Sequence, residues 1–225
     1  MKAIEFVPVS ESILPSDHAM YNPEVKDYDC DVDKAEELLV DLGYDQVNED
    51  GIRYNEAGKE LVFTIFIRGC TVRIAEILKE QLAEAGIGLE VQSAESQTHD
   101  GRLRNNEYEL AIHSGGGWGG DPDYLRGRFM TPADDEEYVD TQSLGYENQE
   151  LNQLLEEQRL ELDEEMRQEI IFEIQEILAE DVPEIPLYHP AGYTAYRPDK
   201  YDGWMFMFAH HSLTHLKLSY LERGG

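Results

Sequence analysis

Positive charge is scarce in this sequence. Only 18 lysines and arginines oppose 48 aspartates and glutamates, which leaves a formal net charge of −30 over 225 residues. A surface of that sign repels the phosphates of nucleic acids and the anionic headgroups of membranes. We therefore expect no nucleic-acid partner and no association with an anionic membrane surface. The hydrophobic fraction of 41% is still large enough for a packed core, so the charge does not indicate a disordered chain.

Long hydrophobic runs are also absent. No stretch reaches the roughly 18 consecutive apolar residues that a transmembrane helix needs. Residues 1–8 carry too short an apolar run for a secretory signal, and Glu5 interrupts it. On these features alone, the chain is either a cytoplasmic protein or a piece excised from a longer one.

Cysteines are few, and recognisable catalytic motifs are missing. Cys30 and Cys70 stand 40 positions apart, which matches no metal-ligand spacing. Because a disulfide needs an oxidising compartment, two free thiols are the default expectation. The sequence contains no Gly-x-Ser-x-Gly elbow, no His-Glu-x-x-His and no Walker loop. We therefore expect neither an enzyme nor a resident cofactor.

Strand-like and helix-like segments alternate in the first half of the chain. Residues 61–67 are apolar at nearly every position, as in a parallel strand buried on both faces. Further strands are expected at 88–93 and 108–113, with a polar helix or loop at 97–106 between them. A helix from residue 71 to Gly86 joins the first two strands, and its inward residues are Ile74, Ile77, Leu78 and Leu82. This order predicts a βαβαβ unit within one compact α/β domain spanning 1–225.

Other elements are expected on the amino-terminal side of this unit. Residues 1–30 carry three prolines and show no period, which predicts an extended lead-in that wraps over the rest. A helix capped by Asp31 or Asp33 should end at Gly43. Its apolar face holds Ala35, Leu38, Leu39 and Leu42. Two turn signals within 48–58 predict a small hairpin.

The second half is expected to hold a pair of helices. The tetrapeptide 145–148 starts the pair, Asp163 caps the second helix, and Pro183 ends it. The expected inward residues are Leu151, Leu154, Leu155 and Leu162 on the first helix and Met166, Ile170, Ile174, Ile177 and Leu178 on the second. Short strands are expected at 185–189, 193–197 and 212–219.

The most informative stretch lies between the last strand of the unit and these helices. Five glycines fall within 115–120 around Trp118, and Asp121 and Asp123 follow on either side of Pro122. Glycine lets a backbone approach another group closely, and open α/β sheets bind ligands beyond the carboxyl ends of their strands. We therefore predict a ligand-binding loop here. Its candidate residues are His113, Gly116, Gly117, Trp118, Gly119, Asp121, Asp123 and Tyr124.

Such a loop suits a ligand with a cationic group. Trp118 offers an apolar cation–π surface, and Asp121 offers a charge-assisted hydrogen bond to an ammonium. Glycine amides can bind the carbonyl groups of an extended backbone. A peptide's amino end, an amino sugar and a polyamine all fit these features. The competing interpretation is structural, in which Asp121 caps a local turn and Trp118 packs into the core.

Other chemistries have weaker support. The glycines at 115, 117 and 120 match the dinucleotide-binding pattern, which needs a helix to begin at the loop. Pro122 disfavours a helical conformation at Asp121, so a nucleotide-binding enzyme domain is only the rival function. An acidic chain produces carboxylate pairs such as Asp121 and Asp123 by chance, which weakens an acid–base interpretation. The simplest interpretation is solvated surface for the acid cluster at 134–137 and for His210, His211 and His215.

Several segments together resemble one protein family. Residues 28–44 are similar to the signature Tyr-Asp-Pro-Glu-Lys-Ala-x-x-Leu-Leu-x-x-Ala-Gly-Tyr, and further likeness lies in 75–91, 145–148 and 174–188. Over residues 25–205 the chain is identified as a member of the extracytoplasmic solute-binding proteins of family 5, the dipeptide/oligopeptide/nickel receptors of ABC importers. The resemblance implies a lobe of the type 2 periplasmic-binding-protein fold, with a βαβαβ core in a mixed sheet flanked by helices.

The resemblance also implies a role and a set of partners. Proteins of this family close two lobes on a ligand, and the likeness assigns 1–225 to the C-terminal lobe, without the first lobe. The full-length protein would be extracytoplasmic and lipid-anchored, and it would deliver its ligand to permease subunits. A single lobe should bind that ligand weakly, because closure of two lobes completes the site.

A ligand class follows from the same likeness. Peptide binders of the family hold the peptide's amino terminus with a Gly-Trp-x-x-Asp segment, which Trp118 and Asp121 match. The extra glycines and the following Asp-Pro-Asp-Tyr depart from that pattern. The implied ligand is therefore a peptide first, and a sugar or chelated nickel second.

The acid excess generates a prediction about salt. Repulsion among these charges lowers the stability of the folded state unless dissolved ions screen it. We expect the melting temperature, followed by circular dichroism, to rise as NaCl is raised from millimolar to molar concentration. KCl at equal ionic strength should act alike. A melting temperature that stays flat or falls would contradict the prediction.

Overall fold

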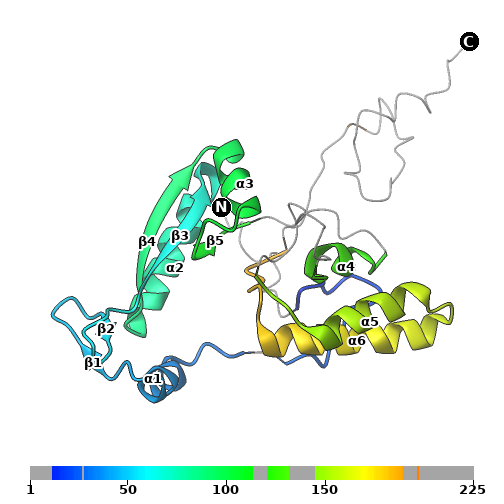
Figure 1. Cartoon of the computed structure of the whole chain (residues 1–225), viewed down its shortest axis with the longest axis horizontal. Helices are drawn as coiled ribbons and strands as arrows, with labels where there is room; N and C mark the ends of the chain where they lie inside the picture. Colours follow the sequence, from blue (N-terminus) through cyan, green and yellow to red (C-terminus); the bar gives the residue numbers. More distant parts are fainter. Residues whose placement is uncertain (1–11, 27, 114–120, 132–144, 190–196, 198–225) are drawn as a thin grey trace, which may run out of the picture. The chain divides into compact units, whose positions relative to one another are not determined.

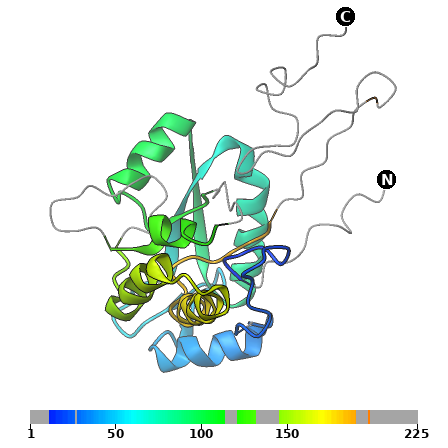
Figure 2. The ribbon, with the colours of Figure 1, turned by 90° about the vertical axis from the view of Figure 1, so that its right-hand side faces the viewer.

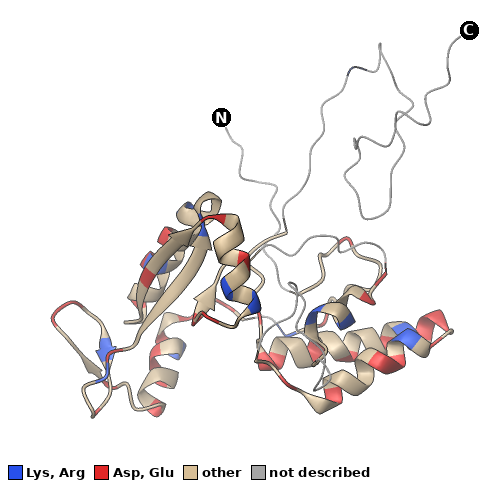
Figure 3. Cartoon of the chain, turned by 45° about the horizontal axis from the view of Figure 1, so that its top comes forward, with Lys and Arg blue, Asp and Glu red and all other residues tan. Residues whose placement is uncertain are grey.

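A computed structural model describes residues 12–26, 28–113, 121–131, 145–189 and 197. The chain divides into two compact units, which are described separately below. Among the described residues, unit 1 takes 12–26, 121–131, 146–189 and 197, and unit 2 takes 28–113 and 145. Acidic residues occur along the helices of both units, and basic residues are far fewer (Figure 3).

Unit 2 is built on a parallel three-stranded sheet. Its strands are β3 (Val62–Arg68), β4 (Gly88–Ala94) and β5 (Leu110–Ala111), in the spatial order β4-β3-β5. The helices α2 (Val72–Glu84) and α3 (Ser96–Arg104) make the two crossovers, as Figure 1 shows and Figure 2 shows from the side. The predicted βαβαβ unit is confirmed. The part of the sheet that the structure describes is parallel throughout.

The two faces of this sheet have different cores. Ile65 and Ile67 point to one face, and their cluster also contains Ala75, Leu89 and Ile112. On the opposite face Phe66 stacks against the buried ring of His99 from α3, at 5.5 Å between ring centroids. Burial on both faces holds only at 65–67, because residues 62–64 are half-buried. The predicted inward position of Ile77 is wrong: its side chain is 47% exposed, and Ala75 faces the sheet instead.

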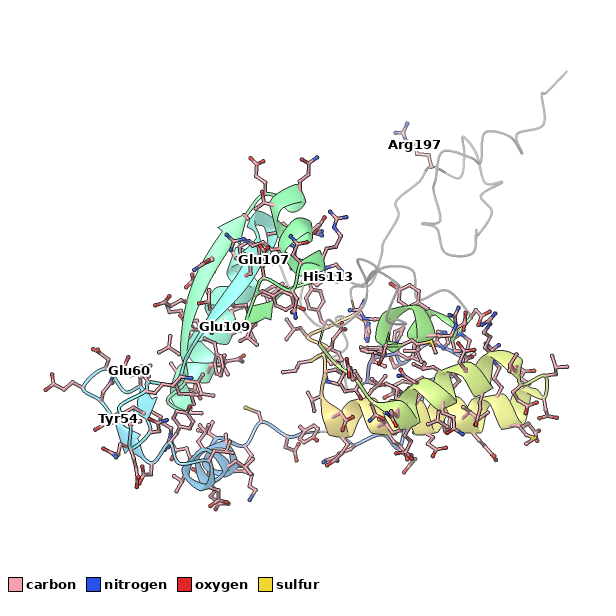
Figure 4. All side chains as sticks on the ribbon, in the orientation of Figure 1. Tyr54, Glu60, Glu107, Glu109, His113 and Arg197 are labelled. Atoms are coloured by element: carbon pink, nitrogen blue, oxygen red, sulfur yellow. The ribbon has the colours of Figure 1, made fainter. Side chains whose placement is uncertain are left out.

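The amino-terminal side of unit 2 holds a helix and a double turn. Helix α1 (Val32–Asp41) begins at Asp31, whose carboxylate accepts the Lys34 amide, and Gly43 follows the helix with a φ of +87°. The hairpin pairs β1 (Gln46–Val47) with β2 (Arg53–Tyr54). A bridge from Tyr54 to Glu60, both labelled in Figure 4, closes the second turn. The capped helix and the hairpin are confirmed.

Arg53 ties this hairpin to both neighbouring helices. Its buried guanidinium donates through Nε to the Ala85 carbonyl at 2.9 Å and through Nη1 to the Tyr44 carbonyl at 3.2 Å. Its Nη2 lies 3.1 Å from the Glu36 carboxylate on α1. Gly86 is required beside it, because a Cβ there would come within 2.6 Å of the Arg53 side chain.

Unit 1 is a helical layer. Its helices are α4 (Tyr124–Phe129), α5 (Gln149–Leu160) and α6 (Glu164–Asp181), and α5 and α6 lie side by side as an antiparallel pair (Figures 1 and 2). Leucines and isoleucines at helical spacing form the core between these helices. The buried cluster consists of Ile13, Leu14, Met20, Leu125, Phe129, Leu151, Leu154, Leu155, Ile171, Ile174 and Leu178.

The turn between α5 and α6 corrects two predicted core positions. Leu162 is 98% exposed, because α5 ends at Leu160 and Glu161 is already extended. Met166, in the first turn of α6, is 56% exposed. Asp163 caps α6 as predicted, since its carboxylate accepts the amides of the two residues after Glu164.

Hydrogen bonds from the tetrapeptide at 145–148 connect the start of α5 to the end of α6. The Tyr146 hydroxyl donates to Asp181 at 2.6 Å, and the Asn148 amide donates to the same oxygen at 2.8 Å. The other end of the Asn148 side chain caps α5 by accepting the Leu151 amide. Burial and the Asp181 carboxylate raise the pKa of Tyr146, while the Tyr146 and Asn148 hydrogen bonds lower the pKa of Asp181. After α6, Val182 adopts a φ of +49° before Pro183.

The described part of the lead-in packs on α6 through one buried amide. The Gln175 Oε1 accepts hydrogen bonds from the Ser12 hydroxyl and from the backbone amide of Asn22, each at 3.1 Å. The Gln175 Nε2 donates to the carbonyls of Met20 and Ile171 at 2.8 and 3.1 Å. Within residues 12–26, Ile13, Leu14 and Met20 join the core of unit 1.

The remaining predictions concern the thiols and the late strands. Cys30 and Cys70 are both free and exposed, as expected. Residues 185–189 do not form a strand, because only Tyr188 takes part in an isolated bridge. The strands predicted at 193–197 and 212–219, the acid cluster at 134–137 and the histidines near 210 lie outside the described residues, with the exception of Arg197.

The buried amide of Gln175 generates a stability prediction. Gln175→Leu removes the hydrogen bonds that Gln175 makes with the Ser12 hydroxyl, the backbone amide of Asn22 and the Met20 carbonyl. We expect a loss of about 2 kcal/mol in the free energy of unfolding, measured by urea denaturation followed by circular dichroism. The matched control is Gln153→Leu, because that amide is exposed and, among the described residues, donates to Glu157 alone. Equal urea midpoints for the two variants would contradict the role of Gln175.

Candidate functional site

The predicted ligand-binding residues are distributed between the two units. Asp121, Asp123 and Tyr124 belong to unit 1, where they connect the glycine-rich segment to α4. His113, labelled in Figure 4, directly follows the last buried residue after β5 in unit 2 and is half-buried. Gly116, Gly117, Trp118 and Gly119 lie outside the described residues. Of the predicted residues, the structure therefore brings together Asp121, Asp123 and Tyr124, at the acidic end of the predicted loop.

Asp121 is an exposed carboxylate with a partner. Its Oδ1 accepts the backbone amide of Asp123 at 3.0 Å and Nη2 of Arg167 at 2.9 Å. The Asp121 side chain remains 60% exposed. No hydrogen bond to its Oδ2 comes from any residue that the structure describes. Asp121 thus caps a local turn, as the structural interpretation expected. Its Oδ2 can still accept a hydrogen bond from another donor.

Asp123 is held more firmly than Asp121. The Arg126 guanidinium donates to it through Nε and Nη2, at 2.9 and 3.1 Å, and the Gln158 amide donates at 2.8 Å. Burial alone would raise the pKa of Asp123, but the hydrogen bonds from Arg126 and Gln158 outweigh it, and the pKa lies below its ordinary value. Asp123 is therefore engaged in the structure rather than available to a ligand.

Gln158 links the two aspartates through one buried side chain. Its Oε1 accepts Nε and Nη2 of Arg167 at 3.2 and 2.8 Å, and its Nε2 donates to Asp123 and to the Leu155 carbonyl. We call these five residues the Gln158 network: Asp121, Asp123, Arg126, Gln158 and Arg167. Two carboxylates and two guanidiniums balance within it, so the network is neutral.

The start of α4 bears on the rival nucleotide function. This helix begins at Tyr124, after the Asp-Pro-Asp turn, and has six residues. The Asp123 carboxylate stands at its first turn and already accepts from Arg126 and Gln158. A phosphate at that helix end would meet a negative charge instead of unoccupied amides. The described geometry therefore disfavours nucleotide binding by the glycine pattern.

Unit 2 carries a second polar arrangement, which was not predicted from the sequence. A cleft of about 580 Å³ lies at the carboxyl ends of β3 and β4, lined by Arg68, Gly69, Cys70 and residues 93–96. Arg68 forms an ion pair with Asp100 on α3. Burial alone would raise the pKa of Asp100, but the hydrogen bonds from Arg68 and His99 lower it below its ordinary value. No group of three potential metal-ligating side chains occurs within the described ranges.

Three members of the Gln158 network were missed from the sequence. Arg126 could have been found, because it stands three residues after Asp123, the spacing of an ion pair on one helix turn. Gln158 also carried a signal, since it occupies the fourth place of the apolar stripe begun by Leu151. Arg167 carried none, because its contact with Asp121 spans 46 positions.

The comparisons with known proteins decide the family. The model of the bacterial extracellular solute-binding proteins, family 5 (middle region), matches residues 5–137. The chain belongs to this family. Its members are binding proteins of the bacterial cell exterior, and the resemblance seen in the sequence is thereby confirmed.

Individual relatives agree with this assignment. Heme-binding protein A of Haemophilus influenzae is 27% identical over 191 residues, which cover 82% of this chain and 32% of that protein. A mannohexaose-bound oligopeptide-binding protein of Thermotoga maritima is 25% identical with a TM-score of 0.70, covering 82% of this chain and 36% of that one. A periplasmic binding protein of Helicobacter pylori with a bound peptide is 25% identical with a TM-score of 0.69, covering 82% and 34%.

These alignments also fix the fold and the extent of the chain. The chain shares the type 2 periplasmic-binding-protein fold with these structures. It spans about a third of the length of the relatives it matches. No helix among the described residues is long and apolar enough to cross a membrane.

The lowered pKa of Asp123 generates a prediction about acid. A carboxylate whose pKa is lower in the folded state stabilises the fold above its unfolded pKa of about 3.9, and that contribution is lost as the pH falls through the folded value. Asp123→Asn should therefore cost about 1 to 3 kcal/mol at pH 7. The difference from wild type should shrink below about pH 4.

Urea denaturation at a series of pH values measures this difference directly. Asp100 and Asp181 also have lowered pKa values, but they are present in both proteins and cancel from the comparison. Asp17→Asn, at an exposed residue of unit 1, is the matched control and should not reproduce the loss of stability at pH 7. A difference between wild type and Asp123→Asn that is constant from pH 7 to pH 3 would refute the prediction.

Proposed function

We propose that this chain is the C-terminal lobe of the substrate-binding component of an ABC importer, and that it captures peptides between itself and a second lobe. The observation that carries the proposal is the position of Asp121. Its carboxylate directly follows the glycine-rich segment, is 60% exposed and has no recorded donor at Oδ2 among the described residues. A charge-assisted hydrogen bond to the amino terminus of a peptide suits such a group.

The family and the extent of the chain support the two-lobed receptor. The relatives are binding proteins about three times as long as the matched region, so each has room for a second lobe. The remaining lobe would complete the site, and closure of the two lobes would sequester the ligand. The partners of the full-length protein would be the permease subunits of the importer, and a lipid anchor would hold it at the cell surface.

The choice of peptide rests on chemistry and on relatives. The Helicobacter pylori protein binds a peptide. The Thermotoga maritima protein holds mannohexaose, and the Haemophilus influenzae relative is named for heme, so a sugar or a chelated metal is the alternative solute. Glycine amides together with Trp118 and Asp121 favour a ligand that has both a backbone and an ammonium.

An NMR titration of the ¹⁵N-labelled chain tests this function. Di- to pentapeptides should shift the Trp118 indole and the amides of 115–120 together, with a dissociation constant in the millimolar range, because one lobe supplies only half of the site. The sequence has two tryptophans, Trp118 and Trp204, so the indole reporter is simple to assign. Mannohexaose and hemin are the probes for the alternative solutes.

Two variants sharpen the titration. Asp121→Ala should weaken peptide binding and reduce the shifts at a given peptide concentration, whereas Asp17→Ala, which removes an equal charge at an exposed position, should leave them as in wild type. Equal shifts in Asp121→Ala and wild type would remove Asp121 from the proposed site. Micromolar affinity for the chain alone would show that a second lobe is unnecessary.

A further inference from the structure

The carboxylate proposed to bind a ligand already has a cationic partner. Arg167 Nη2 donates to Oδ1 of Asp121 at 2.9 Å, and the same oxygen accepts the Asp123 amide. A ligand ammonium is the same kind of donor as this guanidinium. The two cations therefore compete for one carboxylate, although Oδ2 has no recorded donor among the described residues.

Arg167 has a second anchor that does not depend on Asp121. Its Nε and Nη2 both donate to the Gln158 Oε1, at 3.2 and 2.8 Å. Gln158 is fully buried, and its own amide is held by Asp123 and the Leu155 carbonyl. The guanidinium consequently keeps its place on Gln158 whether or not Asp121 retains it.

The charge balance of the Gln158 network determines how strongly an added ammonium is attracted. The Gln158 network contains two carboxylates and two guanidiniums, so it is neutral before any ligand arrives. An added ammonium brings a third positive charge to a site where Asp123 is already occupied by Arg126. Repulsion between the ammonium and Arg167 then offsets part of the attraction to Asp121.

We propose that Arg167 is a specificity-determining residue: it occupies Asp121 as an internal cation and reduces the preference of the site for ligands with a free amino group. The inference rests on the proposed function and deepens it. It assigns only a small share of the binding free energy to the ammonium of the ligand. The sequence motif around Asp121, without Arg167, would predict that the site strongly prefers ligands with a free amine.

A pair of matched probes tests the proposal on the ¹⁵N-labelled chain. Trialanine amide carries a free ammonium, and N-acetyl-trialanine amide lacks it. We expect wild type to bind the two probes with similar millimolar affinity. In Arg167→Gln the free-amine probe should bind about two- to fivefold more tightly, the range that an exposed ion pair supports. Binding of the acetylated probe should stay unchanged.

Two further variants separate the specific pair from general charge effects. Arg159→Gln removes the same charge from an exposed arginine on α5 that pairs with Glu156, and it should leave the ratio of the two affinities as in wild type. Arg167→Lys retains the charge but has no planar fork for Gln158, so it should give an intermediate ratio. It also keeps the test valid if Arg167→Gln does not fold.

Each outcome decides the proposal. An equal change for both probes, or an equal ratio in Arg167→Gln and Arg159→Gln, would overturn it. A strong preference of wild type for the free-amine probe would overturn it as well. If the free-amine probe fails to bind Arg167→Gln at 10 mM, roughly the upper limit of such titrations, releasing Asp121 does not create an amine site. The inference then fails, while the proposed function is judged separately by the titration of the Trp118 indole.

Discussion

A primary amide that leaves water has to replace its hydrogen bonds inside the protein, because each unsatisfied donor or acceptor costs about 1 to 3 kcal/mol. Among the described residues, unit 1 buries three such amides, on Asn22 and on two glutamines, Gln158 and Gln175. Both glutamines stand on the apolar stripes of paired helices, where a leucine would be expected from the spacing. The helices supply some of these partners themselves, but the remaining polar atoms of both glutamines stay unsatisfied unless other segments pack against them.

Each glutamine recruits a different segment. Gln175 binds the lead-in through Ser12, Met20 and Asn22. Gln158 binds the carboxyl end of the glycine-rich segment through Asp123, and it orients Arg167 toward Asp121. The position of the candidate ligand-binding carboxylate thus depends on the packing of α5 against α6. The polar site and the apolar core of this unit are consequently one cooperative structure.

The order of the elements was predictable because hydrophobic periodicity reports it directly. The apolar run at 61–67, the stripe on α2 and the capping aspartates at 31 and 163 all correspond to observed elements. Failures fell where an element ended earlier than its pattern, as at Leu162, or where a small residue took the inward place, as Ala75 did beside Ile77.

The candidate site was predictable only in part, for a physical reason. Glycines, Trp118 and Asp121 mark a loop by local chemistry, and the matching family places them in a binding protein. The partner of Asp121 is a tertiary choice: many arginines could reach a surface carboxylate, and only the packing of α6 selects Arg167. Sequence patterning reports faces and turns, whereas the pairing of charges across 46 positions depends on the finished fold.

The buried bond between Ser12 and Gln175 spans 163 positions, and this separation sets an order of events during synthesis. The elements of unit 2 from α1 to β5 lie in one uninterrupted stretch of chain, so they can assemble as soon as they leave the ribosome. Residues 12–26 are synthesised before them, but their buried hydrogen bonds to Gln175 can form only after α6 has been made. Residues 12–26 are therefore made before unit 2 but acquire these buried bonds only after it, and the apolar cluster of Ile13, Leu14 and Met20 is completed only when α6 is available.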